Sequence, residues 1–346
     1  MMQVKIKSSN NSIFFIGLAL VALLLFLLDL LLGSVDIPFG KTISILFGDR
    51  SDQSWAYIIL SLRLPRAITA LFTGAGLAVA GLLLQTLFRN PLAGPYVLGI
   101  SSGASLGVAL FVMSGSFFSA SWIMNSSWGQ VTASVAGSVI IFLLIIAVSG
   151  RVRDSVSLLI VGIMFGALTT AAVSVLQYFS KPELVQKFVI WTMGSLSSTG
   201  WPQLSVMVPV VTAGIVMSVF LIKPLNAWLL GENNARVTGV PVQRVRLYIL
   251  VASSLIAGAL TAFTGPVAFV GLAVPHLVRF LFGTSNHRIL IPGTILSGTC
   301  LLLVCDIISQ VPGQSLVFPI NAVTALFGAP VVLWIILGQK KLRSSF

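Results

Sequence analysis

The sequence predicts an all-α polytopic membrane protein with about ten transmembrane helices, organised as a single transmembrane domain over residues 1–346. Hydrophobic residues make up 57% of the chain and charged residues only 8%, whereas charged residues are about a quarter of an ordinary soluble domain. Apolar runs of about 20 residues, the length that crosses the hydrocarbon core of a bilayer as a helix, recur along the whole sequence. The segments of about 10 residues with alternating hydrophobicity that are typical of outer-membrane barrels do not occur in it.

The boundaries of the predicted helices follow from the apolar runs and from the Gly, Pro and charged residues between them. In chain order they are residues 13–33, 62–84, 93–113, 130–149, 155–178, 204–223, 246–264, 268–283, 289–308 and 319–338. The first helix follows Lys5 and Lys7, as in a signal peptide, but no small-x-small cleavage site follows Leu32. We therefore expect this run to remain in the protein as a transmembrane helix.

Two polar segments between the helices are expected to have local structure of their own. Residues 181–203 are too polar for a full span and predict an amphipathic or short re-entrant helix at the outer face. The inner loop at about 224–245 carries helix-forming residues bounded by Gly231, Gly239 and Pro241. This pattern predicts two short helices and a turn.

The distribution of charge predicts the orientation of the chain. The net charge is +12, but the basic residues are spread over short segments that flank the spans, so nucleic-acid binding is not indicated. With the N-terminus inside, the inner segments hold fourteen of the 20 Lys and Arg residues. Because cytoplasmic loops carry such an excess, we expect both termini in the cytoplasm.

Small residues predict close packing between helices. Gly74, Gly76 and Gly81 lie in the second predicted helix, and Gly162 and Gly166 form a G-x-x-x-G pattern in the fifth. Such residues let helix backbones approach closely inside a membrane. The pattern indicates a tightly packed bundle.

Few groups in the sequence could carry out chemistry. Cys300 and Cys305 lie in one apolar run and are expected to pack in the core. His276 is expected to have a structural role and His287 to lie in an inner loop. No paired acids, His-x-x-x-His or Ser–Lys arrangement indicates an active site, and the sequence contains no G-x-x-x-x-G-K-[ST] phosphate loop. We therefore expect no catalysis, no metal site and no cofactor in this chain.

Two polar blocks broken by Gly and Pro interrupt the apolar sequence. Residues 85–99 read Gln-Thr-Leu-Phe-Arg-Asn-Pro-Leu-Ala-Gly-Pro-Tyr-Val-Leu-Gly, and residues 265–279 read Gly-Pro-Val-Ala-Phe-Val-Gly-Leu-Ala-Val-Pro-His-Leu-Val-Arg. A bilayer tolerates such segments only where protein or a water-filled path satisfies their polar groups. The blocks therefore indicate a pathway or a docking surface.

Together with four further blocks, these two make the sequence resemble the FecCD-type permease family. The further blocks are Arg63-Leu-Pro-Arg66, Leu230-Gly231 with Ala235 and Gly239, His287-Arg288 with Pro292 and Asp306, and Gly328-Ala-Pro330. Members of that family are membrane subunits of ATP-driven importers for ferric siderophores, haem and cobalamin. The resemblance covers nearly the whole chain. It implies a type II ABC importer permease that translocates a substrate of this kind across the bacterial inner membrane.

The resemblance also implies the partners of the chain. They are a second permease copy, as a homodimer or sometimes a heterodimer, two cytoplasmic ABC ATPases that bind ATP and Mg²⁺, and a periplasmic or lipid-anchored substrate-binding protein. The chain would then receive energy only through contact with the ATPases. A secondary carrier or channel that works without an ATPase is the alternative. It would need ion-coupling charges near the middle of the membrane, and these are scarce here.

In the family, one short motif docks the binding protein at the outer face and another forms a gate at the cytoplasmic face. By the resemblance, Arg63 and Arg66 dock the binding protein, whereas the alternative is that they simply extend toward water at the interface. Asn90, Pro91 and Leu92 correspond to a cytoplasmic gate. Because Pro91 lacks an N–H and disfavours helix at the preceding residue, an ordinary turn is the alternative reading of these three residues.

The inner loop and two of the spans supply the remaining residues that the resemblance implies. Contact with the ATPase is expected from Leu230, Gly231, Glu232, Ala235, Arg236 and Gly239. Glu232 and Arg236 are four residues apart and predict an ion pair worth about 0.3 kcal/mol if exposed. The substrate path is expected to be lined by Ser101, Ser102, Ser105, Thr169 and Thr170. These hydroxyls can instead bond to the backbone of their own helices.

Three positions depart from the family pattern. Gln310 stands where members often carry a further docking arginine, so we expect docking through fewer charges. Val317 and Asn321 replace a glutamate and a glycine before the last span.

Asp29 and Asp306 are the acids nearest to hydrocarbon, and we expect helix-packing hydrogen bonds from them rather than a proton relay.

Overall fold

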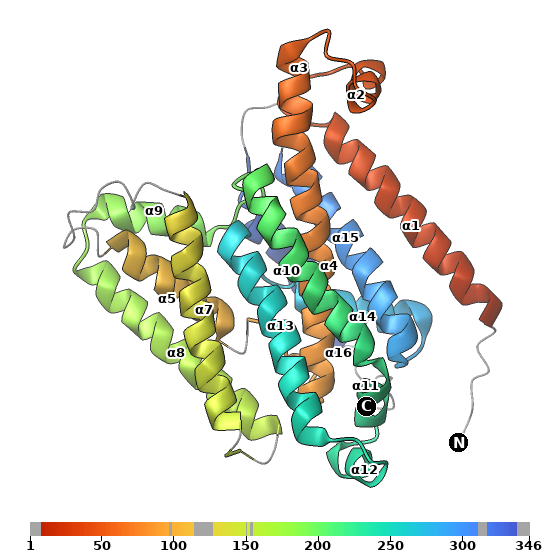
Figure 1. The fold of residues 1–346 in the computed structure, drawn as a ribbon, viewed down its shortest axis with the longest axis vertical. Helices are drawn as coiled ribbons and strands as arrows, with labels where there is room; N and C mark the ends of the chain where they lie inside the picture. The colour runs from red at the N-terminus through yellow and green to blue at the C-terminus, as the bar shows by residue number, and fades with distance from the viewer. Residues whose placement is uncertain are drawn as a thin grey trace.

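The chain folds into a bundle of helices, with no β-strand among the residues that the structure describes (Figure 1). This computed structural model describes residues 8–96, 99–113, 127–149, 151–152, 155–310 and 317–337. Its helices are α1 (Ser8–Leu31), α2 (Phe39–Leu46), α3 (Gln53–Tyr57), the π-helical η1 (Ile58–Arg63), α4 (Leu64–Phe88), α5 (Ile100–Met113), α7 (Ser127–Ser149), α8 (Ser155–Tyr178), α9 (Pro182–Thr192), α10 (Trp201–Phe220), α11 (Ile222–Trp228), α12 (Glu232–Val237), α13 (Val242–Thr264), α14 (Val270–Phe282), α15 (His287–Ser309) and α16 (Ile320–Leu337).

The apolar helices within the described ranges correspond in order to the ten predicted ones. Seven are long enough to cross a bilayer, namely α1, the continuous 36-residue span from α3 to α4, and α7, α8, α10, α13 and α15. The remaining three, α5, α14 and α16, are shorter apolar helices. The segment predicted as a short outer helix forms α9, and the loop predicted to carry two short helices at about 224–245 forms α11 and α12. These element predictions are confirmed.

The second predicted helix, 62–84, is longer at both ends than the sequence indicated. Asp52 begins the helical stretch, because its carboxylate accepts a hydrogen bond from Trp55 N at 3.0 Å, as acids at N-cap positions commonly do. The chain then passes through η1 before Pro65 enters the first turn of α4. Because proline is tolerated in the first turn of a helix, Pro65 led us to predict that the helix starts at about residue 62. The wider π-helical turn instead accommodates Pro65 within one continuous helix.

The third predicted helix, 93–113, starts later than expected. Its first residues, 93–96, are not helical, and α5 begins only at Ile100. Gly99 has a φ of +74° just before that helix, a conformation that favours glycine. The polar block at 85–99 is therefore mostly a connection rather than part of a span.

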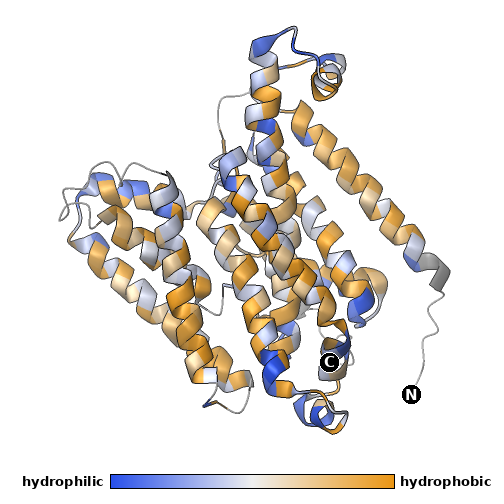
Figure 2. Ribbon diagram, viewed as in Figure 1, coloured by the Kyte–Doolittle hydropathy of each residue, from blue (hydrophilic) through white to orange (hydrophobic). Residues whose placement is uncertain are grey.

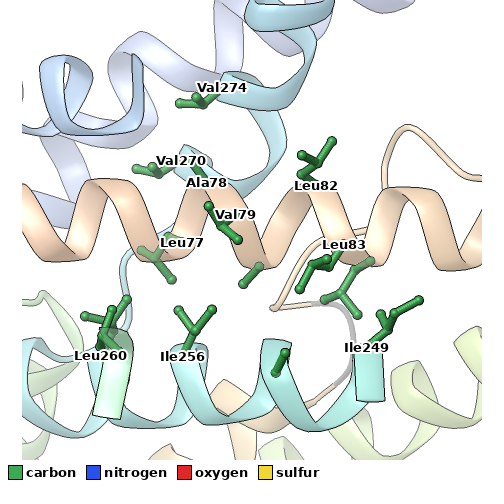
Figure 3. Packing of buried hydrophobic residues seen from close by; sticks show 14 of the residues in the cluster. Leu77, Ala78, Val79, Leu82, Leu83, Ile249, Ile256, Leu260, Val270 and Val274 are labelled. Atoms are coloured by element: carbon green, nitrogen blue, oxygen red, sulfur yellow. The ribbon is translucent and has the colours of Figure 1, made fainter. Parts of the chain in front are cut away.

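Helix α4 is the centre of the bundle. It packs against α10, α13, α14 and α15, and most of its side chains are buried. Figure 3 shows Leu77 and Leu83 facing Ile256 and Ile249 of α13, while Val270 of α14 lies on the opposite side of the helix. An apolar helix that is buried on all sides is expected at the core of a larger bundle.

Glycines bring the backbones close together, as the small-residue pattern predicted. A Cβ atom added at Gly74 would overlap the carbonyl oxygen of Gly298 in α15, and one at Gly81 would overlap that of Gly271 in α14. A Cβ at Gly99 would likewise lie 3.0 Å from Gly166 N in α8. The prediction of tight helix packing is confirmed.

Helices α5, α7 and α8 form a second cluster beside the core around α4 (Figure 1). Gly103 and Gly107 of α5 lie directly against Gly137 and Ala133 of α7. Helix α13 connects the two clusters because it packs against α4 on one side and against α5 and α7 on the other. Helix α9 lies across one end of the second cluster, next to α5.

The surface of the bundle separates into apolar sides and polar ends. Figure 2 shows apolar residues along α1, α7 and α8, and polar residues at the end that carries α2 and α3 and at the opposite end that carries α12. Only 11% of the apolar span of α1 is buried, as expected for a helix that faces lipid. We call the two polar regions the α2–α3 end and the α12 end.

Candidate functional site

The segment expected to contact an ATPase forms the tip of the α12 end (Figure 1). Gly231 and Gly239, on either side of α12, have φ values of +100° and +82°, so both turns depend on glycine. Ala235 is buried, whereas Leu230 and Val237 are 63% and 88% exposed. Exposed apolar side chains at a polar end of the molecule are typical of a contact surface for another protein.

Glu232 in this segment pairs with two arginines. Arg236 Nη2 lies 3.2 Å from Glu232 Oε1, which confirms the pair that the four-residue spacing predicted. Arg246 of α13 lies 3.1 Å from the same oxygen, and its side chain is almost completely buried. Arg246 also donates to Val152 O, at 3.0 Å, in the turn between α7 and α8. This buried arginine joins α12 to both helix clusters, a role that the sequence did not indicate.

The turn that corresponds to a gate directly follows α4. Arg89 ends the helix in a left-handed conformation with a φ of 47°. Asn90 Oδ1 then accepts a hydrogen bond from Leu92 N at 2.9 Å, and the Leu92 side chain is 44% exposed. A polar hollow of about 750 Å³ lies between Arg89 and the start of α12 at Gly231. The turn and the α12 segment are therefore neighbours.

His276 of α14 holds this turn in place. Its Nε2 lies 2.7 Å from Pro91 O, and because a carbonyl oxygen only accepts, Nε2 carries the proton. The structural role predicted for His276 is confirmed. The prediction for His287 was wrong, because it is not a loop residue but the fully buried first residue of α15.

At the α2–α3 end, Arg63 is buried rather than directed toward water. Its Nη1 donates to Leu30 O at 3.0 Å and to Leu31 O at 2.8 Å, and its Nη2 donates to Val35 O. Carbonyls at the C-terminal end of a helix have no partner within the helix and attract cations. Arg63 therefore caps α1, which differs from the water-facing position expected for a docking residue.

Arg66 finds its carboxylate within the same chain. Its Nε and Nη2 donate to Asp306 at distances between 2.7 and 3.0 Å. Gln310, one turn further along, donates to Asp306 at 3.3 Å and to Asp29 of α1 at 2.9 Å. The glutamine that replaces a family arginine thus joins two acids. The Arg66 side chain keeps 13% of its surface exposed and lines a hollow of about 260 Å³.

A second acid–base pair at the α2–α3 end joins α2 to the loop that follows it. Asp49 accepts hydrogen bonds from Ser51 N at 2.8 Å and from the Ser44 hydroxyl at 3.2 Å, and it lies 3.6 Å from Lys41 Nζ. These hydrogen bonds, led by the one from the Ser51 backbone, lower the pKa of Asp49 to about 2. Lys41 is therefore already compensated by an ionised neighbour.

The two other departures from the family pattern lie near the start of α16. Asn321 Oδ1 accepts from Ala268 N at 3.1 Å, and Asn321 N donates to Met193 O at 3.2 Å. A glycine could make only the backbone contact, so Asn321 adds a bond to the segment before α14. Val317 is 59% exposed.

The hydroxyls expected along a substrate path lie on α5 and α8, which pack against each other. Three of them donate to a carbonyl one turn back in their own helix: Ser105, Thr169 and Thr170. Ser101 is buried, with its Oγ 3.3 Å from Thr261 Oγ1 of α13. These bonds correspond to the alternative that the sequence left open. Ser102 is half-buried and Thr170 exposed.

The described parts of the chain contain no group of three or more His, Cys, Asp or Glu residues that could hold a metal ion. Cys300 and Cys305 are both unoxidised thiols on α15, and Cys305 is buried. The core packing that the sequence predicted is confirmed for Cys305, whereas Cys300 is only half-buried and lies at the contact with α1, 3.7 Å from Leu18 O.

Comparison with known proteins identifies the family. The model of the FecCD transport family matches residues 20–338. The chain belongs to the FecCD transport family. Its similarity to the hemin transport system permease protein HmuU of Yersinia pestis is 37% identity over 324 residues, which cover 93% of this chain and 96% of HmuU. The vitamin B12 import system permease protein BtuC of Salmonella paratyphi A is 33% identical over 331 residues, covering 96% of this chain and 97% of BtuC.

The FecCD-family chain also matches a solved structure closely. A metal-chelate type ABC transporter in an inward-facing conformation superposes with a TM-score of 0.81 at 31% sequence identity. The match covers 94% of this chain and 99% of that one. The predicted fold class, the permease fold of this kind of importer, is confirmed.

Proposed function

We propose that this FecCD-family chain is the membrane-spanning permease of an ATP-driven importer in the bacterial inner membrane. The observation that carries the proposal is the match of nearly the whole chain to transport permeases, in sequence to HmuU and BtuC and in structure to a metal-chelate type ABC transporter. The sequence has no phosphate loop, so ATP and Mg²⁺ would be bound by a separate ATPase chain.

The α12 end is the surface proposed for the ATPase. The exposed Leu230, which precedes α12, and the exposed Val237, the last residue of α12, offer apolar contacts, and the Glu232–Arg246 pair holds the helix in position. The excess of Lys and Arg in the segments of this end supports a cytoplasmic location for it and for both termini. Two permease copies, as a homodimer, would then bind two ATPases.

The α2–α3 end is the surface proposed for a periplasmic or lipid-anchored binding protein. Arg66 is the docking candidate, because its side chain reaches a hollow at this end, whereas Arg63 is engaged with the end of α1. Lys41 is paired with Asp49, and Gln310 brings no charge. Few unpaired charges support docking that depends only weakly on salt.

The proposed cargo is a haem, cobalamin or ferric siderophore type chelate. HmuU is a hemin permease and BtuC a vitamin B12 permease, and both cover this chain almost completely. Such large substrates need a wide path with weak binding, and the half-buried Ser102 and the exposed Thr170 are the residues proposed to line it. The turn at Asn90, Pro91 and Leu92 is proposed to narrow the path at the cytoplasmic side.

The deciding experiment is native mass spectrometry of the protein purified from its own membrane, followed by uptake assays in vesicles. In the mass spectrum we expect two permease copies with two ATPases. In the uptake assay we expect the chelate to be taken up only when ATP is present on the side of the vesicle membrane that carries the ATPases. Transport by a lone permease in vesicles without ATP would instead support a secondary carrier or channel, and the proposal would be wrong.

A further inference from the structure

Polar side chains fill the space between α11, α15 and the last turn of α4 at the α12 end: Thr86 and His287 are buried, and Asn226 is half-buried. The His287 ring places Nδ1 2.8 Å from Asn226 Oδ1 and Nε2 2.9 Å from Thr86 Oγ1. Trp228, also on α11, is buried and donates to Leu87 O at 3.2 Å. Helix α11 is therefore tied twice to the end of α4.

The hydrogen positions in this group follow from its donors and acceptors. Asn226 Oδ1 also accepts from the His287 backbone N–H at 2.9 Å, which fixes the oxygen of the amide on that side. Because this oxygen only accepts, His287 Nδ1 carries a proton, and Nε2 of the neutral ring is an acceptor. The Thr86 hydroxyl then donates to Nε2 rather than to Leu82 O, its other acceptor. Both nitrogens of the His287 ring therefore have hydrogen-bond partners while the ring is neutral, and no charge is buried here.

A second polar group begins at the neighbouring residue of α4. Gln85 is fully buried, its Oε1 accepts from Arg279 Nη1 at 2.6 Å, and its Nε2 donates to Leu272 O at 3.2 Å. Arg279 lies one turn along α14 from His276, which donates to Pro91 O. Helix α14 therefore holds both the last turn of α4 and the turn that follows it.

These bonds make the joined elements costly to separate. A buried polar group that loses its partner destabilises the fold, and a charged one does so more strongly. Helix α4 packs against α11, α14 and α15, and α15 packs in turn against α11 and α14. A displacement of α11 that kept its polar contacts would therefore carry the end of α4 and α14 with it.

We propose that these contacts form a strut that carries movement of the α11–α12 segment to the turn at Pro91. The strut consists of Asn226, His287, Thr86, Gln85, Arg279 and His276. The inference rests on the proposed function, which assigns α12 to the ATPase contact and the turn to the cytoplasmic gate. Both histidines are positioning residues, because His287 acts through Thr86 and His276 through Pro91.

The test measures the turn itself in the assembled transporter. Leu92→Cys, placed in a chain with Cys300→Ala and Cys305→Ala, reports the turn through its rate of reaction with a water-soluble maleimide. The complex with ATPase and binding protein is labelled without nucleotide and after trapping with ATP and vanadate. We expect the rate to depend on nucleotide, and His276→Leu to abolish that dependence while ATPase co-purification is retained. His276→Gln, whose amide N–H can still reach Pro91 O, should keep it.

A second pair of variants tests the other end of the strut. Thr86→Val removes the donor to His287 and should also abolish the nucleotide dependence, whereas Thr86→Ser keeps the hydroxyl and should preserve it. The matched control is Thr294→Val, because Thr294 is equally buried but donates only to Ile291 O within α15. This control should behave like the parent chain.

The outcomes separate the strut from the proposed function. If His276→Leu and Thr86→Val both keep the nucleotide dependence, the strut is overturned and the gate assignment stands. If the Leu92→Cys parent shows no nucleotide dependence at all, the gate assignment is wrong and the strut is overturned with it.

Discussion

At the scale of single residues, two arginines three positions apart have different roles. Arg63 is compensated by carbonyl oxygens, because Leu30 and Leu31 end α1 and leave their carbonyls without helical partners. Arg66 is compensated by a carboxylate, Asp306, in a bidentate arrangement that binds guanidinium groups strongly. Both compensations come from the same chain. Arg66 also borders a surface hollow, whereas Arg63 is almost completely buried, so the two residues are expected to differ when they are substituted.

The first prediction separates these roles. Arg63→Leu leaves the buried Leu30 carbonyl without its donor, and a buried acceptor without a partner costs about 1–3 kcal/mol, so we expect a lower midpoint of thermal unfolding in detergent. Affinity for the binding protein, measured on the folded fraction, should stay unchanged, whereas Arg66→Leu should weaken it. Lys181→Leu, at an exposed lysine at the start of α9, is the control and should change neither quantity. Weaker docking by Arg63→Leu with an unchanged midpoint would contradict the capping role.

At the scale of helices, the sequence predicted the elements well because each one carries its own signal. Apolar runs of the right length indicated the ten apolar helices, and the glycines on either side of α12 indicated that short helix. The continuation of α4 into η1 was missed because Pro65 is equally compatible with a helix start and with a π-helical turn.

Contacts between distant helices could not be predicted in the same way. Arg66 and Asp306 are 240 residues apart, and Thr86 and His287 are 201 apart. Nothing in the spacing of a single sequence indicates which polar residues of two such helices meet. The local parts of the candidate site, the turn at Pro91 and the Glu232–Arg236 pair, were therefore predicted, whereas Arg246, Asn226 and the position of His287 were not.

The second prediction concerns the attachment of α12. Arg246→Met removes the bond to Val152 O and leaves Glu232 with only its exposed partner, so we expect a cost of about 2 kcal/mol and a loss of ATPase co-purification. The matched variant is Arg236→Met, because that arginine is 56% exposed and pairs with the same glutamate. Such a pair contributes about 0.3 kcal/mol, so co-purification should be retained. Equal behaviour of the two variants would show that Arg246 does not hold α12.

At the scale of the whole molecule, the α4 core is packed more tightly than the contact between the two helix clusters. Around α4 the backbones of α14 and α15 come so close that glycine is required at the contacts. Between α7, α10 and α13, by contrast, lies an apolar hollow of about 630 Å³. The α4 core therefore resembles a rigid body, and the contact between the clusters is the place where relative movement costs least.

The third prediction tests this difference with one kind of substitution. A Cβ at Gly81 or Gly298 would overlap a backbone carbonyl of the facing helix, which cannot move without separating the helices, so the cost should exceed the 1–3 kcal/mol typical of overpacking. We expect Gly81→Ala and Gly298→Ala to abolish the monodisperse peak in size-exclusion chromatography. At Gly258 in α13 the nearest atom is Ser138 Cβ at 3.4 Å, an ordinary contact between the clusters. Gly258→Ala should therefore purify like the parent chain. If it does not, the contact between the two clusters is as tightly packed as the α4 core.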